Sequence, residues 1–290
     1  QQQASRAAVY LGLTRPRLGT LGLITVLCSH FLALSLPGTH ADAAVTGALV
    51  LGGMLTLSGA SALNQWLERH PDALMRRTAG RPLPTGSISP AKALGFGLTL
   101  SSAGLLVLWW GVNPAAAAWA LIGILSYAAI YTPLKQRSNL NTLVGALPGA
   151  VPAFMGWVAA RPLDPNAWTL FAILALWQVP HFLSIARLYR VDYHRAGFQM
   201  LGGAADAGAS LSRQGLLYAV AILPCALLMV QRGFASPLFG LAAALLCFYY
   251  ASAARGLRDG GSAQEARRLL RASVVFLPSL FLALLIDRWT

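Results

Sequence analysis

The 290-residue chain is 56% hydrophobic and only 11% charged, which excludes an ordinary soluble domain, where charged residues make up about a quarter of the chain. Its formal net charge of +13 would suggest a nucleic-acid partner in a soluble protein, but here the basic residues lie between long apolar blocks. Blocks of about 20 residues can cross the hydrocarbon layer of a membrane, whereas a barrel would show short alternating segments. The composition therefore predicts an all-α polytopic membrane protein, one domain over residues 1–290, that contacts a lipid bilayer and no nucleic acid.

Taken in chain order, the apolar blocks predict nine transmembrane helices. Their bounds are residues 18–37, 43–66, 92–111, 114–133, 142–160, 167–186, 214–231, 235–255 and 270–288. With the N-terminus inside, all of the 22 Lys and Arg residues lie on the inner side except Arg161, Arg232 and Arg288. This bias agrees with the positive-inside rule and supports both the orientation and the number of helices.

The connections between the predicted helices are unequal in length. The outer connections are tight, whereas the inner connections at 67–91 and 187–213 are long. Long polar loops on one side of a membrane domain usually carry its function, so we expect catalytic residues in both, with the N-terminal segment 1–17 on the same side. Neither a cleavable signal nor a transit-like segment is evident, which favours a bacterial inner membrane with the site facing the cytoplasm.

Asn64, Glu68 and Asp72 recur every four residues at the end of the second predicted helix. Four residues advance a helix by about 400°, so the three oxygen-bearing side chains share one face. An amide and two carboxylates suit Mg²⁺, which can in turn hold a phosphate group. The alternative is a helix end that becomes polar on reaching water, and Pro71 predicts that Asp72 lies just beyond that end. The next cations in this loop are Arg76, Arg77 and Arg81.

A second polar cluster lies where the fourth predicted helix meets the inner surface. Tyr131 and Lys135 are four residues apart, with Arg137 two residues further on, and all three side chains can donate to phosphate oxygens. Ordinary anchoring at the membrane interface explains the same residues, because aromatic and basic side chains gather there. Taken alone, the pattern favours anchoring.

A third cluster begins inside the sixth predicted helix and continues into the loop behind it. Gln178 and His181 lie well within the apolar block, where polar side chains are costly and often functional. His181 can ligate a metal, hydrogen-bond a substrate carboxylate or bridge helices. Asp192 can pair with a neighbouring arginine or reach a second metal ion. If the inner helix ends converge, the three clusters form one polar cavity that fits a diphosphate head, with apolar walls for a hydrocarbon tail.

Long motifs resemble those of the UbiA superfamily of intramembrane prenyltransferases, in the right order over nearly the whole chain. Residues 64–83, which read Asn-x3-Glu-x3-Asp and then Met-x-Arg-Thr-x2-Arg-Pro-Leu, are similar to the first Asp-rich motif of that superfamily. Tyr131-x3-Lys135 resembles its YxxxK element. Trp177-x2-Pro180-His181-Phe182, followed by Arg190-x-Asp192-Tyr193, resembles the branch that prenylates haem.

The resemblance implies a nine-helix bundle with its site on the cytoplasmic or matrix side. It also implies Mg²⁺-assisted loss of diphosphate from farnesyl diphosphate, attack by a haem B vinyl group, and addition of water to give a hydroxyethylfarnesyl side chain. The catalytic residues would be Asn64, Glu68, Asp72, Lys135 and Asp192, with Asn64, Glu68, Asp72 and Asp192 as the metal ligands. The substrate-binding residues would be Arg76, Arg77, Arg81, Tyr131, Arg137, His181, Arg190 and Tyr193.

Several alternatives stay open at this point. The second motif of the superfamily usually carries two or more acids, and Asp192 alone leaves the number of Mg²⁺ ions at one or two. His181 would serve haem as a propionate partner or an axial ligand. A haem-A synthase or terminal-oxidase assembly factors would be the protein partners. The competing functions are prenylation of an aromatic quinone precursor, and transport of an anionic lipid or metabolite, which would need polar groups near mid-bilayer.

Overall fold

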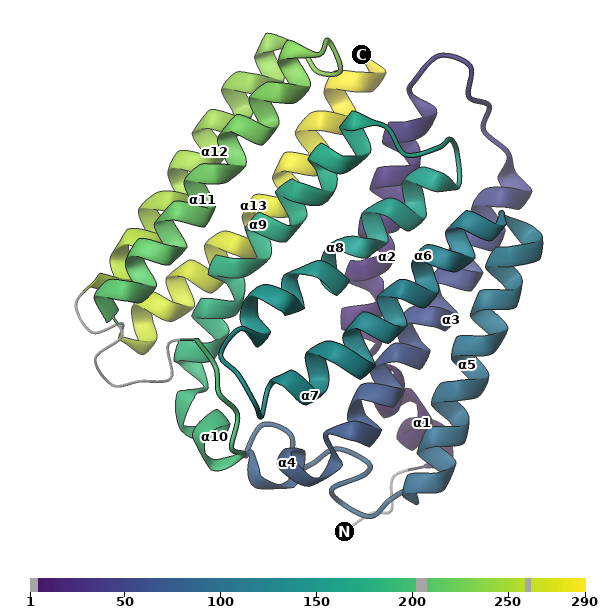
Figure 1. Cartoon of the computed structure of the whole chain (residues 1–290), viewed down its shortest axis with the longest axis vertical. Coiled ribbons are helices and arrows are strands. Elements are labelled where there is room, and N and C mark those ends of the chain that lie inside the picture. The colour runs from purple at the N-terminus through teal and green to yellow at the C-terminus, as the bar shows by residue number, and fades with distance from the viewer. Residues whose placement is uncertain (1–4, 202–207, 259–261) are drawn as a thin grey trace.

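The computed structural model describes residues 5–201, 208–258 and 262–290, and every regular element in these ranges is helical. This confirms the all-α prediction. The short helices α1, α4 and α10 lie at the lower end of the bundle in Figure 1, and the C-terminus lies at the upper end. In chain order the elements are α1 (Arg6–Thr14), α2 (Pro16–Leu34), α3 (Ala43–Leu67), α4 (Arg69–Leu74), α5 (Pro90–Gly111), α6 (Pro114–Leu125), the π-helical η1 (Ser126–Tyr131), α7 (Thr132–Leu134), α8 (Asn141–Val158), α9 (Pro165–Leu188), α10 (Arg190–Arg195), α11 (Gly208–Gln231), α12 (Pro237–Arg255), the 3₁₀ turn η2 (Gly256–Arg258) and α13 (Ala263–Trp289).

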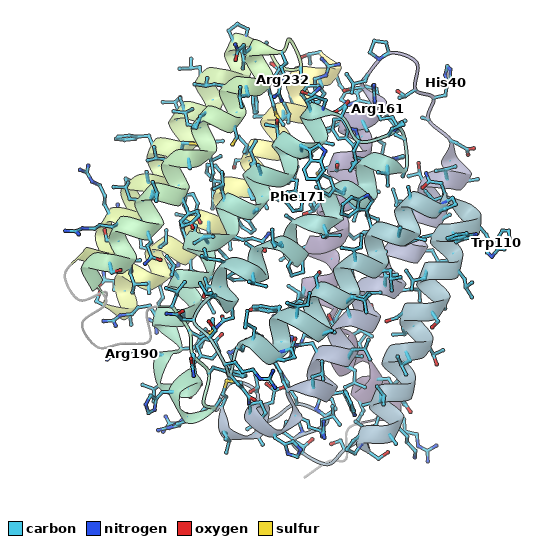
Figure 2. The ribbon with its side chains drawn as sticks, in the orientation of Figure 1. His40, Trp110, Arg161, Phe171, Arg190 and Arg232 are labelled. Carbon is cyan, nitrogen blue, oxygen red and sulfur yellow. The ribbon has the colours of Figure 1, made fainter. Side chains whose placement is uncertain are left out.

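Eight helices in the described part of the chain are long and apolar enough to cross a membrane, so the protein is an integral membrane protein. One of them is continuous through α6, η1 and α7, and the others are α2, α3, α5, α9, α11, α12 and α13. The remaining predicted block, 142–160, forms α8, which is not among these eight. Figure 2 shows Arg161 and Arg232 at the end of the bundle opposite Arg190, as the charge pattern predicts.

Local chemistry explains why several helices begin where they do. Asn113 and Asp164 each precede a proline at the first helical position, where a missing N–H costs nothing. The Asn113 side chain accepts a hydrogen bond from the Ala116 N–H at 2.8 Å, and Asp164 caps α9 in the same way. The short connections before α6 and α9 therefore carry their own start signals.

The helix α8 is the centre of the bundle, since it packs against α2, α6 and α9 and most of its side chains are buried. It contains Pro148 and Pro152, which weaken its own hydrogen-bond ladder. Two neighbouring helices also bond to carbonyls of α8: Gln178 donates to the Ala146 carbonyl at 3.3 Å, and Ser29 donates to the Ala153 carbonyl at 2.6 Å.

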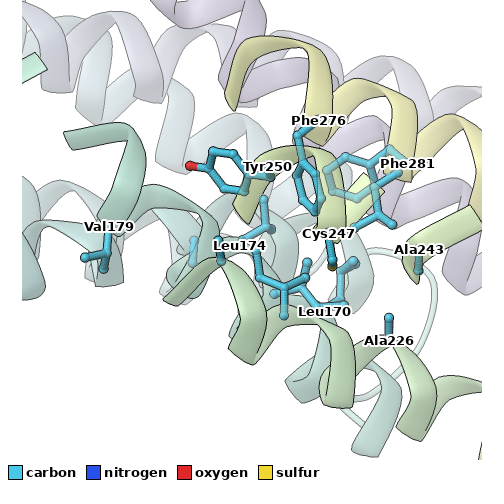
Figure 3. Packing of buried hydrophobic residues seen from close by; sticks show 14 of the residues in the cluster. Leu170, Leu174, Val179, Ala226, Ala243, Cys247, Tyr250, Phe276 and Phe281 are labelled. Atoms are coloured by element: carbon cyan, nitrogen blue, oxygen red, sulfur yellow. The ribbon is translucent and has the colours of Figure 1, made fainter. Parts of the chain in front are cut away.

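The largest apolar core lies between α9, α11, α12 and α13 (Figure 3). Leu174 of α9, Tyr250 of α12 and Phe276 of α13 meet there, and the Tyr250 and Phe276 rings stack with centroids 5.0 Å apart. Cys247 is buried in the same core as a free thiol, which agrees with a packing role. This core fixes α9 against α13 and so positions the polar residues of α9 described below.

Candidate active site

The first motif forms a buried polar face at the end of α3. The helix α3 ends at Leu67, so Asp72 lies beyond the helix end as predicted, but it belongs to the short helix α4 that follows. The Glu68 N–H donates to the Asn64 carbonyl at 2.9 Å, and the Asp72 N–H donates to the Glu68 carbonyl at 2.8 Å. Because these i→i+4 bonds continue across the break, the three side chains keep one face, and all three are buried.

Each carboxylate of this face pairs with a cation. Glu68 Oε1 lies 2.6 Å from Lys135 Nζ, which brings the second cluster to the first across 67 residues of sequence. Asp72 Oδ2 lies 2.5 Å from an Arg81 nitrogen. The Asn64 side-chain amide donates to the Thr132 hydroxyl at 3.0 Å. The end of α3, the loop behind α4 and the start of α7 therefore converge on one site.

The two carboxylates differ in their electrostatic environment. Burial alone would raise the pKa of Glu68, but the charge and hydrogen bond of Lys135, with help from Arg15 and Arg81, hold that pKa below its usual value. Burial and the neighbouring Glu68 charge raise the pKa of Asp72 in spite of Arg81. Burial alone would lower the pKa of Lys135, but the facing Glu68 carboxylate holds that pKa above its usual value.

Oxygen atoms suited to a divalent cation remain on this face. Asn64 Oδ1 and Asp72 Oδ1 are buried and have no hydrogen-bond partner among the described residues. Such atoms are costly to bury unless something binds them. Among the described residues no three His, Cys, Asp or Glu side chains cluster, so the candidate ligand set is two carboxylates and one amide. This hard, all-oxygen set fits Mg²⁺.

The second inner loop closes over Lys135. The Gln199 N–H donates to the Lys135 carbonyl at 2.7 Å, and the Asn141 side chain donates to the Gln199 carbonyl at 2.6 Å. Phe198 packs with Met75 of the first loop in a small apolar cluster, which Tyr193 joins at its edge. Lys135 Nζ lies 4.4 Å from the centroid of the Tyr131 ring and 5.8 Å from that of Phe198.

Asp192 is not joined to the buried face. Its carboxylate lies 4.0 Å from Arg195, one turn along α10. It opens into a shallow depression of about 310 Å³ at the lower end of the bundle, which neither Glu68 nor Asp72 lines. Arg76 and Tyr189 border this depression. The Arg77 guanidinium carbon lies over the Tyr189 ring, 5.0 Å from its centroid. The other predicted substrate ligands, Arg137 and Arg190, are exposed.

A row of aromatic rings leads from Lys135 into the bundle. Tyr131 stacks near Phe182 with centroids 6.5 Å apart, Phe182 meets His181 at 5.8 Å, and His181 stacks on Trp177 at 5.1 Å. The sequence motif includes Phe182 and Trp177, but periodicity alone assigns them no role. We identify the row from its position beside the ion pairs.

His181 is anchored to α13 by one ring nitrogen. Its Nδ1 lies 2.8 Å from the Ser273 hydroxyl, which itself donates to the Leu270 carbonyl at 2.6 Å. A hydroxyl carries one proton, so Ser273 accepts from His181, which places the imidazole proton on Nδ1. The lone pair of the neutral ring is then on Nε2.

The helical bundle with an acidic face at one end defines a class of membrane enzyme. Residues 22–284 match the UbiA prenyltransferase family, and the chain belongs to that family. Its fold is similar to that of a digeranylgeranylglyceryl phosphate synthase, with a TM-score of 0.80 over 97% of this chain and 98% of the other at 16% identity. It is also similar to a UbiA homologue from Archaeoglobus fulgidus bound to GPP and Mg²⁺, with a TM-score of 0.71 over 95% and 99% of the two chains at 13% identity.

The sequence is more closely similar to one kind of enzyme within this family. A protoheme IX farnesyltransferase from Solibacter usitatus is 39% identical over 96% of this chain and 98% of its own length. Proteins of the same name from an Anaeromyxobacter species and from Myxococcus xanthus are 42% and 40% identical, over 94% and 97% of this chain and 90% and 95% of their own lengths.

Proposed function

We propose that the protein converts haem B to haem O by transferring a farnesyl group from farnesyl diphosphate to a haem vinyl group. The observation that carries this proposal is the pair of buried ion pairs, Glu68 with Lys135 and Asp72 with Arg81, beside unpartnered oxygens at one end of a membrane bundle. Full-length similarity to protoheme IX farnesyltransferases supports haem as the acceptor.

In the proposed reaction the allylic C–O bond of farnesyl diphosphate breaks, and its electron pair leaves with the diphosphate. The π electrons of the haem vinyl group form the new C–C bond to the allylic carbon. The cation that results next to the porphyrin ring takes up water, which loses a proton to leave the hydroxyethylfarnesyl side chain.

Mg²⁺, when bound, would neutralise negative charge on the diphosphate, and Asn64, Glu68 and Asp72 are the residues that would hold it. Whether Asp192 joins them depends on movement of α10, since its carboxylate faces Arg195 in this structure. Lys135 and Arg81 have a different task. Their N–H groups stabilise the leaving diphosphate once its oxygens replace the carboxylates as acceptors.

The aromatic row would guide the allylic group. The π faces of Tyr131 and Phe182 stabilise positive charge and exclude water from the carbon that becomes cationic. The row includes His181, whose Nε2 lone pair suits haem iron. A propionate partner would instead need an N–H at that atom. Of the two haem-binding roles open to His181, the tautomer therefore favours axial ligation, and the Ser273 hydrogen bond agrees with the third alternative, a bridge between helices.

The basic end of the bundle would face the cytoplasm of a bacterial cell. Arg161 and Arg232 lie at the other end (Figure 2), and Arg288, near the end of α13, donates to the Phe234 carbonyl at 3.1 Å and the Ser35 carbonyl at 2.8 Å. With α8 counted as a crossing helix, the chain passes the membrane nine times and starts inside, in agreement with the positive-inside rule.

The test is a prenyl-transfer assay on the purified protein in detergent. Haem B, farnesyl diphosphate and Mg²⁺ are supplied together, and the haem is examined by mass spectrometry. We expect a product heavier than haem B by farnesyl plus water. Prenylation of an aromatic acid in place of haem would assign the chain to the quinone-precursor branch. Retention of both substrates unchanged, with uptake of an anionic lipid into vesicles, would favour a transporter.

A further inference from the structure

Arg15 occupies an unusual backbone position between α1 and α2. Its φ of 47° makes it the only non-glycine residue with positive φ in the described part of the chain. This left-handed region is disfavoured for side chains with a Cβ, and a glycine or asparagine is usual at such a helix end. Pro16 follows at the first position of α2, so the chain turns sharply at Arg15.

Gln65 holds this turn against α3. Its side-chain amide donates to the Gly12 carbonyl at 3.0 Å and to the Leu13 carbonyl at 2.9 Å, which are free carbonyls at the end of α1. Leu13 is fully buried beside Ala62 and Leu83. Gln65 lies one helical turn before Glu68, so the same helix end that carries the acidic face also fixes the Arg15 backbone.

The Arg15 guanidinium differs from the other cations of the site. Lys135 and Arg81 each hold a carboxylate, whereas Nε and one terminal nitrogen of Arg15 are buried with no hydrogen-bond partner among the described residues. The Gln65 contacts hold Arg15 near the acidic end of α3, and the Arg15 charge acts to lower the pKa of Glu68 and Asp72. Buried guanidinium N–H groups are costly unless an acceptor reaches them.

We propose that Arg15 is a diphosphate-binding residue, held in a strained backbone position so that its unpartnered N–H groups meet the head group of the prenyl donor. This inference rests on the proposed function. A guanidinium presents a planar fork of N–H donors that matches two phosphate oxygens. The ion pairs at Glu68 and Asp72 are balanced, so the charge of Arg15 offsets the net negative charge of a magnesium diphosphate. Neither the acidic motif nor the Tyr131-x3-Lys135 element contains this residue.

The test compares Arg15→Asn with Arg17→Asn, which removes an exposed cation two residues away. Asparagine adopts the left-handed conformation readily, so the melting temperature of Arg15→Asn should equal or exceed that of the wild type. Binding of inorganic pyrophosphate and of unreactive farnesyl thiodiphosphate, each with Mg²⁺, is measured by calorimetry. We expect both probes to bind about ten- to a hundredfold more weakly to Arg15→Asn, the effect of losing hydrogen bonds to a charged group, and unchanged to Arg17→Asn.

The outcomes separate the inference from the proposed function. Haem B binding should be the same in all variants, because Arg15 would touch only the diphosphate. Wild-type affinity of Arg15→Asn for both probes would overturn the role of Arg15 and leave the proposed function standing. A wild-type protein that binds neither probe would overturn both. Should Arg15→Asn fail to fold, Arg15→Gly relieves the same strain and carries the same expectation.

Discussion

Replacing Lys135 by methionine measures what its ion pair with Glu68 contributes to stability. The charged atoms are 2.6 Å apart, and the two side chains are only 13% and 7% exposed. At an effective dielectric constant of about 20, the Coulomb attraction at that distance is about 6 kcal/mol. Part of this attraction offsets the desolvation of the two charges. Removing one partner of a buried pair usually costs about 3–5 kcal/mol, so we expect Lys135→Met to lower the free energy of unfolding by that amount.

A double variant separates this effect from catalysis. In Glu68→Gln with Lys135→Met, no charge is left buried without a partner, so most of the lost stability should return. Prenyl transfer should remain lost in both variants, because Lys135 would contact the diphosphate. Unfolding is followed in detergent by denaturant titration. A single variant as stable as the wild type, or a double variant no more stable than the single one, would refute the coupling.

Three further experiments test the rest of the site. Asp72→Asn should lower prenyl transfer by about a hundredfold or more, the effect of losing one charge that stabilises the transition state, and should also lower the melting temperature, because Arg81 loses its partner. Removal of divalent cations with EDTA should abolish turnover, and Mg²⁺ should restore it; activity that persists would exclude the metal assignment. Ser273→Ala removes the hydroxyl that fixes the His181 proton on Nδ1. Haem B binding, followed by haem absorption, should weaken about tenfold, the effect of altering the hydrogen-bond partner of a metal ligand. Ser184→Ala, which removes a buried hydroxyl that donates to the His181 carbonyl at 2.6 Å, is the matched control.

The acidic face was predictable because its geometry is local. Spacing of four residues gives Asn64, Glu68 and Asp72 a common face in any helix, and the hydrogen bonds across the break at Glu68 preserve that register. The position of the break was not predictable from Pro71. A proline near the start of a helix costs nothing, and Pro71 lies near the start of α4.

The partners of these residues were not predictable, because they depend on tertiary packing. Lys135 meets Glu68 across 67 residues of sequence, and His181 meets Ser273 across 92. Arg15 gave no signal as a ligand, since a basic residue before an apolar block is equally expected from the positive-inside rule. For Asp192 the motif gives a signal that the structure does not match. The motif assigns Asp192 to the metal, whereas its carboxylate lies 4.0 Å from Arg195.

The paired charges explain how so polar a site can stay folded beside the membrane without its substrates. Glu68 and Asp72 are buried, and either carboxylate alone would be strongly destabilising there. Lys135 and Arg81 neutralise them, and the same two cations are free to turn to a diphosphate when it supplies oxygens of its own. Binding of the donor is then an exchange of partners: Mg²⁺ would take over the two carboxylates, and the diphosphate would take up Lys135, Arg81 and the so far unpartnered Arg15. Lys135 and Arg81 therefore stabilise both the resting protein and the leaving group.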